Sequence, residues 1–155
     1  MSQNIITDMI KFTTSDGVTF DVYLKGNRVV LIGNSGTGKS FFANQLQMFS
    51  ENPDSIPALS ALKDKVIVIN RKNYKTFSLL SLLSSSKGKL FVLDDGDYYL
   101  NNELAAVIVR NKKSQFIIVS RMFLPWNISP NYYGKFIVKD KRVQLSYISN
   151  NTGWD

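Results

Sequence analysis

The sequence contains no cysteine and no histidine, and these two absences exclude several kinds of chemistry. Without cysteine there is no disulfide, no thiolate nucleophile and no cysteine-ligated metal. Without histidine there is no imidazole acid–base catalysis, and most zinc sites are excluded. Long apolar runs are missing as well, because none approaches the ~20 residues that a membrane span requires. Carboxylates, lysines, hydroxyl groups, backbone dipoles and magnesium remain for chemistry, and we expect a cytoplasmic protein.

The chain is short and basic. Its 155 residues include 19 lysines and arginines against 12 acidic residues, for a formal net charge of +7. This length suits a single domain, 1–155, which can bury roughly two thirds of its unfolded surface. A pI near 9.6 allows binding to nucleic acid. However, no recognition helix, zinc finger or RNA-binding motif favours that interpretation over a solvated, lysine-rich surface.

Hydrophobic patterning predicts strands that alternate with helices. Four continuous apolar runs are typical of strands buried on both faces of a parallel sheet. They lie at 29–32, 66–69, 90–93 and 116–119. Helices are expected at 39–49, 76–83 and 101–110, and a loop at 51–62. This alternation predicts βαβ units and a mostly parallel sheet.

Two β-hairpins are expected at the ends of the chain. In the segment 9–25, apolar and polar residues alternate around Asp16-Gly17, a strong tight-turn signal. The segment 136–148 has a similar pattern around Asp140-Lys141. The residues at 149–155 are expected to form a loose tail. The hairpins would add antiparallel strands to the sheet.

A glycine-rich segment follows the first apolar run and carries the clearest chemical signal. It matches G-x-x-x-x-G-K-[ST] at every fixed position. Its residues are Gly33, Asn34, Ser35, Gly36, Thr37, Gly38, Lys39 and Ser40. Glycines let backbone N–H groups surround a phosphate, and the positive end of the next helix faces the same anion. We expect this loop, with Phe41 after it, to bind a nucleotide, Lys39 to reach the β- and γ-phosphates and Ser40 to bind Mg²⁺.

This motif, between a buried strand and a helix, resembles that of the P-loop NTPases over roughly residues 18–148. The resemblance implies an α/β fold with a three-layer, mostly parallel sheet, and it implies ATP and Mg²⁺ as cofactors. In that family an apolar strand ends in an aspartate that holds magnesium, and the strand 90–93 followed by Asp94 fits this element. The guanine-reading sequence N-K-x-D is absent, which favours adenine over guanine.

Within the family, the chain is most similar to the additional-strand branch of RecA-like, AAA+ and ABC-type ATPases. There a glutamate near the magnesium aspartate polarises the attacking water, whereas Asp95 holds the adjacent position here. The carboxylate of an aspartate lies about 1.5 Å closer to the backbone than that of a glutamate, and such a misplacement can cost ~100-fold in rate. Ser120 ends the next strand, where the branch has a polar residue that senses the γ-phosphate, and Arg121 follows it. The resemblance implies catalytic roles for Lys39, Asp95, Ser120 and Arg121.

The chain also departs from this branch. It has no L-S-G-G-Q signature, no switch histidine, no room for a helical insertion before Asp94 and no helical lid after Val119. ABC-type ATPases open with antiparallel strands that carry an aromatic residue stacked on adenine. Phe12 and Tyr23 are the candidates here, although a strand aromatic more often packs in a core.

Three functions fit these features. The first is an ATPase that is slow alone and is completed by a protein partner, nucleic acid or a second copy, with Arg71 or Arg121 as an arginine supplied in trans. The second is a nucleotide-binding interaction module with little hydrolysis. The third is a small-molecule kinase with an acceptor site at 70–75, although a phosphoryl-clamping lid would need more arginines. We favour Mg·ATP binding with weak or partner-dependent hydrolysis.

Overall fold

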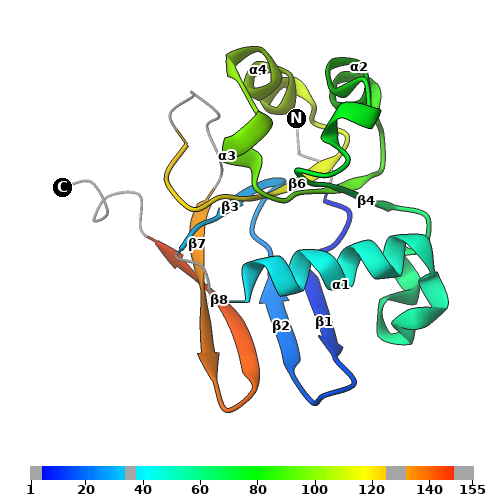
Figure 1. Ribbon diagram of the computed structural model, residues 1–155, viewed down its shortest axis with the longest axis vertical. Coiled ribbons are helices and arrows are strands. Elements are labelled where there is room, and N and C mark those ends of the chain that lie inside the picture. The colour runs from blue at the N-terminus through cyan, green and yellow to red at the C-terminus, as the bar shows by residue number, and fades with distance from the viewer. Residues whose placement is uncertain (1–4, 34–37, 125–131, 149–155) are drawn as a thin grey trace.

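Eight strands form one mixed sheet in the computed structural model, which describes residues 5–33, 38–124 and 132–148. The sheet is mostly parallel, ends in antiparallel hairpins and curls into a half-barrel, so the fold class is α/β (Figure 1). The strand order is β1-β2-β8-β7-β3-β6-β5-β4. The strands are β1 (Met9–Thr13), β2 (Thr19–Tyr23), β3 (Arg28–Leu31), β4 (Val66–Ile69), β5 (Leu90–Leu93), β6 (Gln115–Val119), β7 (Tyr132–Lys139) and β8 (Arg142–Ile148).

The four apolar runs of the sequence form the parallel strands β3, β6, β5 and β4, as predicted. Their side chains alternate between two hydrophobic cores. Val29 and Val92 face a core that includes α1 (Lys39–Glu51) and both hairpins, whereas Val30 and Phe91 face a core under α4 (Asn102–Arg110). Helices therefore cover both faces of these strands (Figure 1). Burial on both sides explains why the runs are continuously apolar.

Both predicted hairpins are confirmed. Gly17 has a φ of +89° in the first turn, a conformation that glycine adopts without strain. Asp140 and Lys141 both have positive φ in the turn between β7 and β8, as a two-residue hairpin loop requires. The sequence does not predict that β2 pairs in parallel with β8, with Phe20 opposite Val143. This pairing joins the hairpins into one four-stranded limb of the sheet.

The helices follow the predicted stripes with shifted ends. α1 buries Phe42, Leu46 and Phe49, and the side chain of Asn101 caps α4 by accepting a hydrogen bond from the N–H of Leu104 at 2.9 Å. The remaining helices are α2 (Leu79–Ser85), α3 (Gly96–Tyr99) and the 3-10 helices η1 (Pro53–Ser55), η2 (Pro57–Leu62) and η3 (Tyr74–Thr76). No helix among the described residues is long and apolar enough to cross a membrane.

Buried polar side chains tie the amino ends of the central strands together. The amide of Gln115, which is 1% exposed, accepts hydrogen bonds from the N–H groups of Ile6 and Thr7. It also donates to the carbonyl groups of Thr7 and Gly26. A buried amide with this many backbone partners anchors the chain before β1 to the centre of the sheet.

We predict that Gln115→Leu lowers the free energy of unfolding by about 1–3 kcal/mol, because it removes these hydrogen bonds and leaves buried backbone groups unpaired. Urea denaturation monitored by circular dichroism would measure the change. Gln144→Leu, at an exposed strand position, is the matched control and should stay within ~0.5 kcal/mol of wild type. Equal stability of both variants would contradict the anchoring role.

Candidate functional site

The carboxyl ends of the parallel strands bring the predicted site residues to one edge of the sheet. β3 leads to Gly33, β5 ends before Asp94 and β6 ends before Ser120. Two backbone hydrogen bonds continue the ladder past the strand ends. The N–H of Ser120 donates to Leu31 at 2.9 Å, and the N–H of Asp94 donates to Ile69 at 2.8 Å. Segments distant in sequence therefore meet at this edge.

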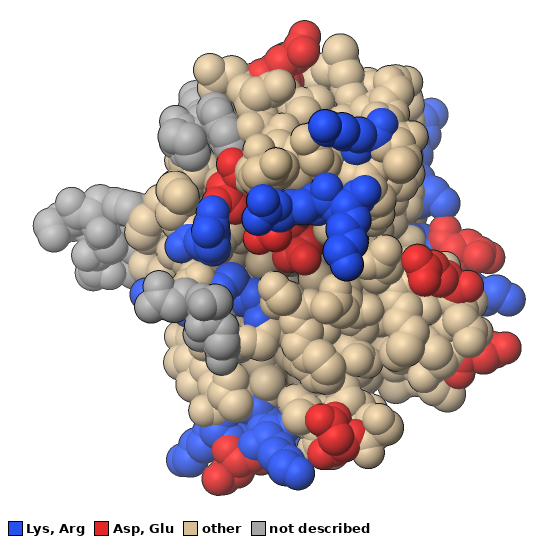
Figure 2. Space-filling view, in the orientation of Figure 1, with Lys and Arg blue, Asp and Glu red and all other residues tan. Residues whose placement is uncertain are grey.

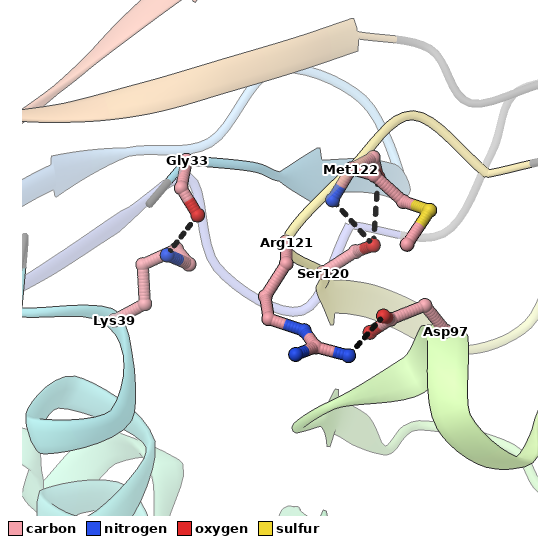
Figure 3. Close-up of polar contacts among 6 residues, drawn as sticks. All are labelled: Gly33, Lys39, Asp97, Ser120, Arg121 and Met122. Carbon is pink, nitrogen blue, oxygen red and sulfur yellow. Dashed lines mark hydrogen bonds and ion pairs between the residues drawn. The ribbon is translucent and has the colours of Figure 1, made fainter. Parts of the chain in front are cut away.

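Lys39 is the first residue of α1, and its side chain contacts the first residue of the glycine-rich segment. Its side chain is 6% exposed, and its ammonium group donates a hydrogen bond to the carbonyl oxygen of Gly33 at 2.5 Å (Figure 3). Burial lowers the pKa of Lys39, while the carboxylates of Asp94, Asp95 and Asp97 act in the opposite direction. This hydrogen bond thus joins Lys39 to the first residue of the glycine-rich segment, of which residues 34–37 lie outside the described residues.

Asp94 is a buried carboxylate with unused hydrogen-bonding capacity. It is 7% exposed, and its Oδ1 atom is buried without a hydrogen-bond partner among the described residues. Burial, followed by the nearby charge of Asp95, raises the pKa of Asp94 to about 6. A buried carboxylate oxygen of this kind suits a cation, and the hydroxyl-bearing Ser40 lines the same cavity. No group of three or more acidic side chains in the described part of the chain could hold a metal by itself.

Asp95 occupies an unusual backbone position because of the short helix α3. Its φ is +53°, a conformation that aspartate tolerates better than most side chains. Gly96 follows, and a Cβ atom there would lie 2.7 Å from Cγ2 of Ile118 in β6. The glycine therefore allows α3 to pack closely on the sheet. Helix α3 is not predicted by the hydrophobic pattern, although a glycine directly after two aspartates is a signal for such a turn.

Ser120 and Arg121 make local contacts in this structure. The buried hydroxyl of Ser120 donates to the carbonyl of Met122 at 2.7 Å and accepts from the Met122 N–H at 3.2 Å. The guanidinium of Arg121 lies 3.6 Å from the carboxylate of Asp97, whose side chain is nearly buried while Arg121 is 63% exposed. Figure 3 shows this ion pair together with Ser120 and Lys39. Ser120 thus stabilises its own turn, and Arg121 reaches the acidic side of the site.

A cavity of about 630 Å³ connects the start of α1 with the ends of β4 and β5. It is lined by Ser40, Asn44, Gln47, Asn70, Arg71, Lys72, Asn73, Asp94 and Asp95. Its walls carry both signs of charge, and Figure 2 shows lysine and arginine side chains close to a small acidic group near the middle of the face in view. Asn44 and Gln47 were not predicted as site residues, although both lie on the helix that follows the glycine-rich segment.

The loop after β4 is held rigidly at the mouth of this cavity. The side chain of Asn70 accepts hydrogen bonds from the N–H groups of Lys72 and Asn73 and donates to Gln47 at 3.0 Å. The guanidinium of Arg71 lies 4.0 Å from the centre of the Tyr98 ring, a favourable cation–π distance. These contacts fix the position of Arg71 beside the residues that follow Asp95.

The three aromatic candidates lie away from this cavity. Phe12 is 3% exposed and stacks on Phe20 at 5.1 Å between ring centroids, so it belongs to the core. Phe41 is partly exposed, and its ring lies 5.9 Å from Phe20. Tyr23 is 48% exposed on the first hairpin. None of the three lines the cavity that contains Ser40 and Asp94.

Comparison with known proteins relates the fold to solved structures. No protein-family profile matches the sequence, and no curated protein is similar to it. A chain named RNase-L inhibitor has a similar fold, with a TM-score of 0.50 and 13% identity over 99% of this chain and 42% of that one. A second solved structure is the complex of the archaeal ribosomal stalk protein aP1 with the archaeal ribosome recycling factor aABCE1. It has a TM-score of 0.46 and 13% identity over 93% of this chain and 40% of that one.

Both neighbours are ABC-type ATPase chains, and this chain spans less than half the length of each. At this level of identity the similarity concerns the fold alone.

We predict that Asp94→Asn stabilises the metal-free protein at high pH. Because the pKa of Asp94 is raised from 3.8 to about 6, the folded protein keeps a proton that the unfolded chain releases. The stability linked to that proton is present at low pH and is lost as the pH rises from about 4 through 6. The variant should therefore be more stable than wild type by about 2–3 kcal/mol at pH 8, and equal to it near pH 4.

Urea denaturation at several pH values, in the presence of a metal chelator, would test this. Asp64→Asn is the control, because it makes the same change at an exposed aspartate. A difference between Asp94→Asn and wild type that does not change with pH would contradict the prediction.

Proposed function

We propose that residues 1–155 form a single P-loop nucleotide-binding domain of the additional-strand branch, which binds Mg·ATP and hydrolyses it slowly when alone. The observation that carries this proposal is the placement of Lys39 and Asp94. The lysine is bonded to Gly33 at the start of α1, and the carboxylate with a buried, unpartnered oxygen lies at the same sheet edge. The position of β6 between β3 and β5 also supports an additional-strand core, as do helices on both faces of these strands.

The residues of the site divide into three roles in this proposal. The glycine-rich segment, from Gly33 to Ser40, surrounds the phosphates, and on binding Lys39 exchanges its bond to the Gly33 carbonyl for the β- and γ-phosphates. Ser40 and Asp94 would hold Mg²⁺, which neutralises charge on the phosphates when bound. Asp95, on the wall of the same cavity, orients the attacking water or accepts its proton.

Arginine completes the charge balance of the proposed reaction. Phosphoryl transfer spreads negative charge over the γ-phosphate oxygens, and an arginine that meets this charge can raise the rate by about 10³–10⁵. Arg121 is paired with Asp97 and Arg71 with the Tyr98 ring. Each would have to leave its present partner or be supplied to a second copy. This requirement is the physical reason to expect slow hydrolysis by the isolated chain.

We predict that Lys39→Ala abolishes binding of Mg·ATP, because the variant loses the cation that meets the β- and γ-phosphates. Isothermal titration calorimetry with ATP, GTP and a non-hydrolysable ATP analogue would measure it. Lys63→Ala, at an exposed loop position, is the control and should bind like wild type. Since Lys39 is buried, circular dichroism must show that the variant is folded. Wild-type affinity in a folded Lys39→Ala protein would refute the proposal.

We predict that Asp95→Asn reduces phosphate release at least ~10-fold while nucleotide binding is retained, because the amide cannot accept the proton of the attacking water. Asparagine tolerates the positive φ at this position, so folding should be preserved. Phosphate release would be followed at several protein concentrations and compared with binding by calorimetry. Asp64→Asn again serves as the control, and full activity of Asp95→Asn would remove Asp95 from the mechanism.

An interaction module with little hydrolysis is the second candidate function. The local hydrogen bonds of the Ser120 hydroxyl favour it, since they leave this side chain engaged with Met122 rather than turned to a phosphate. The same calorimetric and phosphate-release measurements separate the two functions. Binding of ATP without phosphate release at any protein concentration would favour the module, and release that rises with concentration would favour the ATPase.

A further inference from the structure

The limb of the sheet formed by the two hairpins is covered on one face only. Phe12, Phe20 and Phe136 point to α1 and are buried. The opposite face, which we call the outer hairpin face, carries the alternate residues of β1, β2, β7 and β8. It includes Met9, Lys11, Tyr23, Lys135, Ile137 and Gln144. The 3-10 helix η2 borders this face at β1, where Ala58 and Ala61 line a hollow together with Met9 and Lys11. The proposed nucleotide site lies at another edge of the sheet.

A hollow of about 500 Å³ with a mixed lining lies at the middle of the outer hairpin face. Met9, Tyr23 and Ile137 line it, together with the polar side chains of Gln144 and Ser146 and with Asp21. Met9 and Tyr23 are directly paired across β1 and β2. The three apolar residues are 38%, 48% and 54% exposed. Large apolar side chains that gather around one hollow, instead of standing singly, mark an interaction site.

The charge around this hollow is mainly positive. Lys11, Lys135 and Lys139 are exposed on the same face. The carboxylate of Asp21 is neutralised by the guanidinium of Arg142 at 2.9 Å. Asp140, in the turn between β7 and β8, is a further acidic residue beside this face; with Lys139 and Arg142 it borders a second, adjacent hollow of about 300 Å³. The face therefore combines exposed apolar side chains with a surplus of lysine.

We propose that the outer hairpin face binds single-stranded nucleic acid. A nucleobase would lie in the hollow against the ring of Tyr23 and the side chains of Met9 and Ile137, with Gln144 and Ser146 at its polar edge. The backbone phosphates would meet the lysines. This combination of a stacking platform and cationic side chains is how single strands are bound with little sequence preference. A duplex hides its base faces, and a peptide of acidic residues alone has no flat ring for the hollow.

Fluorescence anisotropy with a labelled oligothymidylate of about 20 nucleotides would test the proposal. Lys135→Gln/Lys139→Gln should weaken binding by roughly tenfold or more at low salt and reduce the slope of log K against log [salt] by up to ~1.4. The control is Lys87→Gln/Lys112→Gln, which removes the same charge from exposed positions outside the hairpins. It should change binding by less than about threefold, since only contacts to phosphate release counterions.

Tyr23→Ala tests the base contact separately from charge. It should weaken binding by roughly 5- to 100-fold, as expected for the loss of one stacked base, while the salt slope stays unchanged. Circular dichroism would confirm that the variants are folded. Duplex DNA, poly-glutamate and vesicles of anionic lipid would serve as competitors and should displace the oligonucleotide poorly.

Three results would overturn the proposal. They are no binding at low salt, equal loss in both lysine double variants, and binding that Tyr23→Ala leaves unchanged. Lys39→Ala should bind the oligonucleotide like wild type, because Lys39 does not lie on the outer hairpin face. Failure of the nucleotide proposal and failure of this one are therefore distinguishable.

Discussion

The parallel pairing of β3, β6, β5 and β4 is the constraint on which the rest of the structure depends. Because these strands run in one direction, their carboxyl ends meet at one edge, and Gly33, Asp94 and Ser120 are brought together there. Pairing of β3 with β6 also requires both faces of these strands to be covered by helices. Lys39 therefore begins a helix that packs on one face, while α3 begins directly after Asp95 on the other. The grouping of polar residues at the carboxyl ends of these strands is therefore a consequence of their parallel pairing.

Much of this fold is predictable from local patterns, because the signals that define its strands are local. Continuous apolar runs identify β3 to β6, and Asp16-Gly17 identifies the first hairpin. Strand order is different, since it depends on contacts between distant segments. The pairing of Phe20 with Val143 joins two hairpins that are separated by more than a hundred residues, and no alternation within either hairpin indicates it. Helix α3 was missed for another reason, because four residues are too few to show a period.

The candidate site divides in the same way. Lys39 and Asp94 are predictable because a motif and a strand end fix their backbone positions. The contacts of the neighbouring side chains depend on packing between distant segments, and the motif carries no information about that packing. The hydroxyl of Ser120 bonds to its own turn, Arg121 is held by Asp97, and Asp95 has a positive φ because α3 begins beside it. These contacts decide which groups are available to a ligand, and the spacing of residues along the sequence does not reveal them.

Helix α1 connects the candidate site with the core beneath the outer hairpin face. It begins at Lys39, and one turn later Phe42 packs against rings from both hairpins, with centroid distances of 5.3 Å to Phe20 and 5.3 Å to Phe136. A displacement of α1 by phosphate would therefore press on the core beneath the outer hairpin face. Such coupling requires that the nucleotide binds two positions of α1 with different affinity. Where it does, linkage makes the effect reciprocal, so that a ligand on the hairpins must change nucleotide affinity by the same factor.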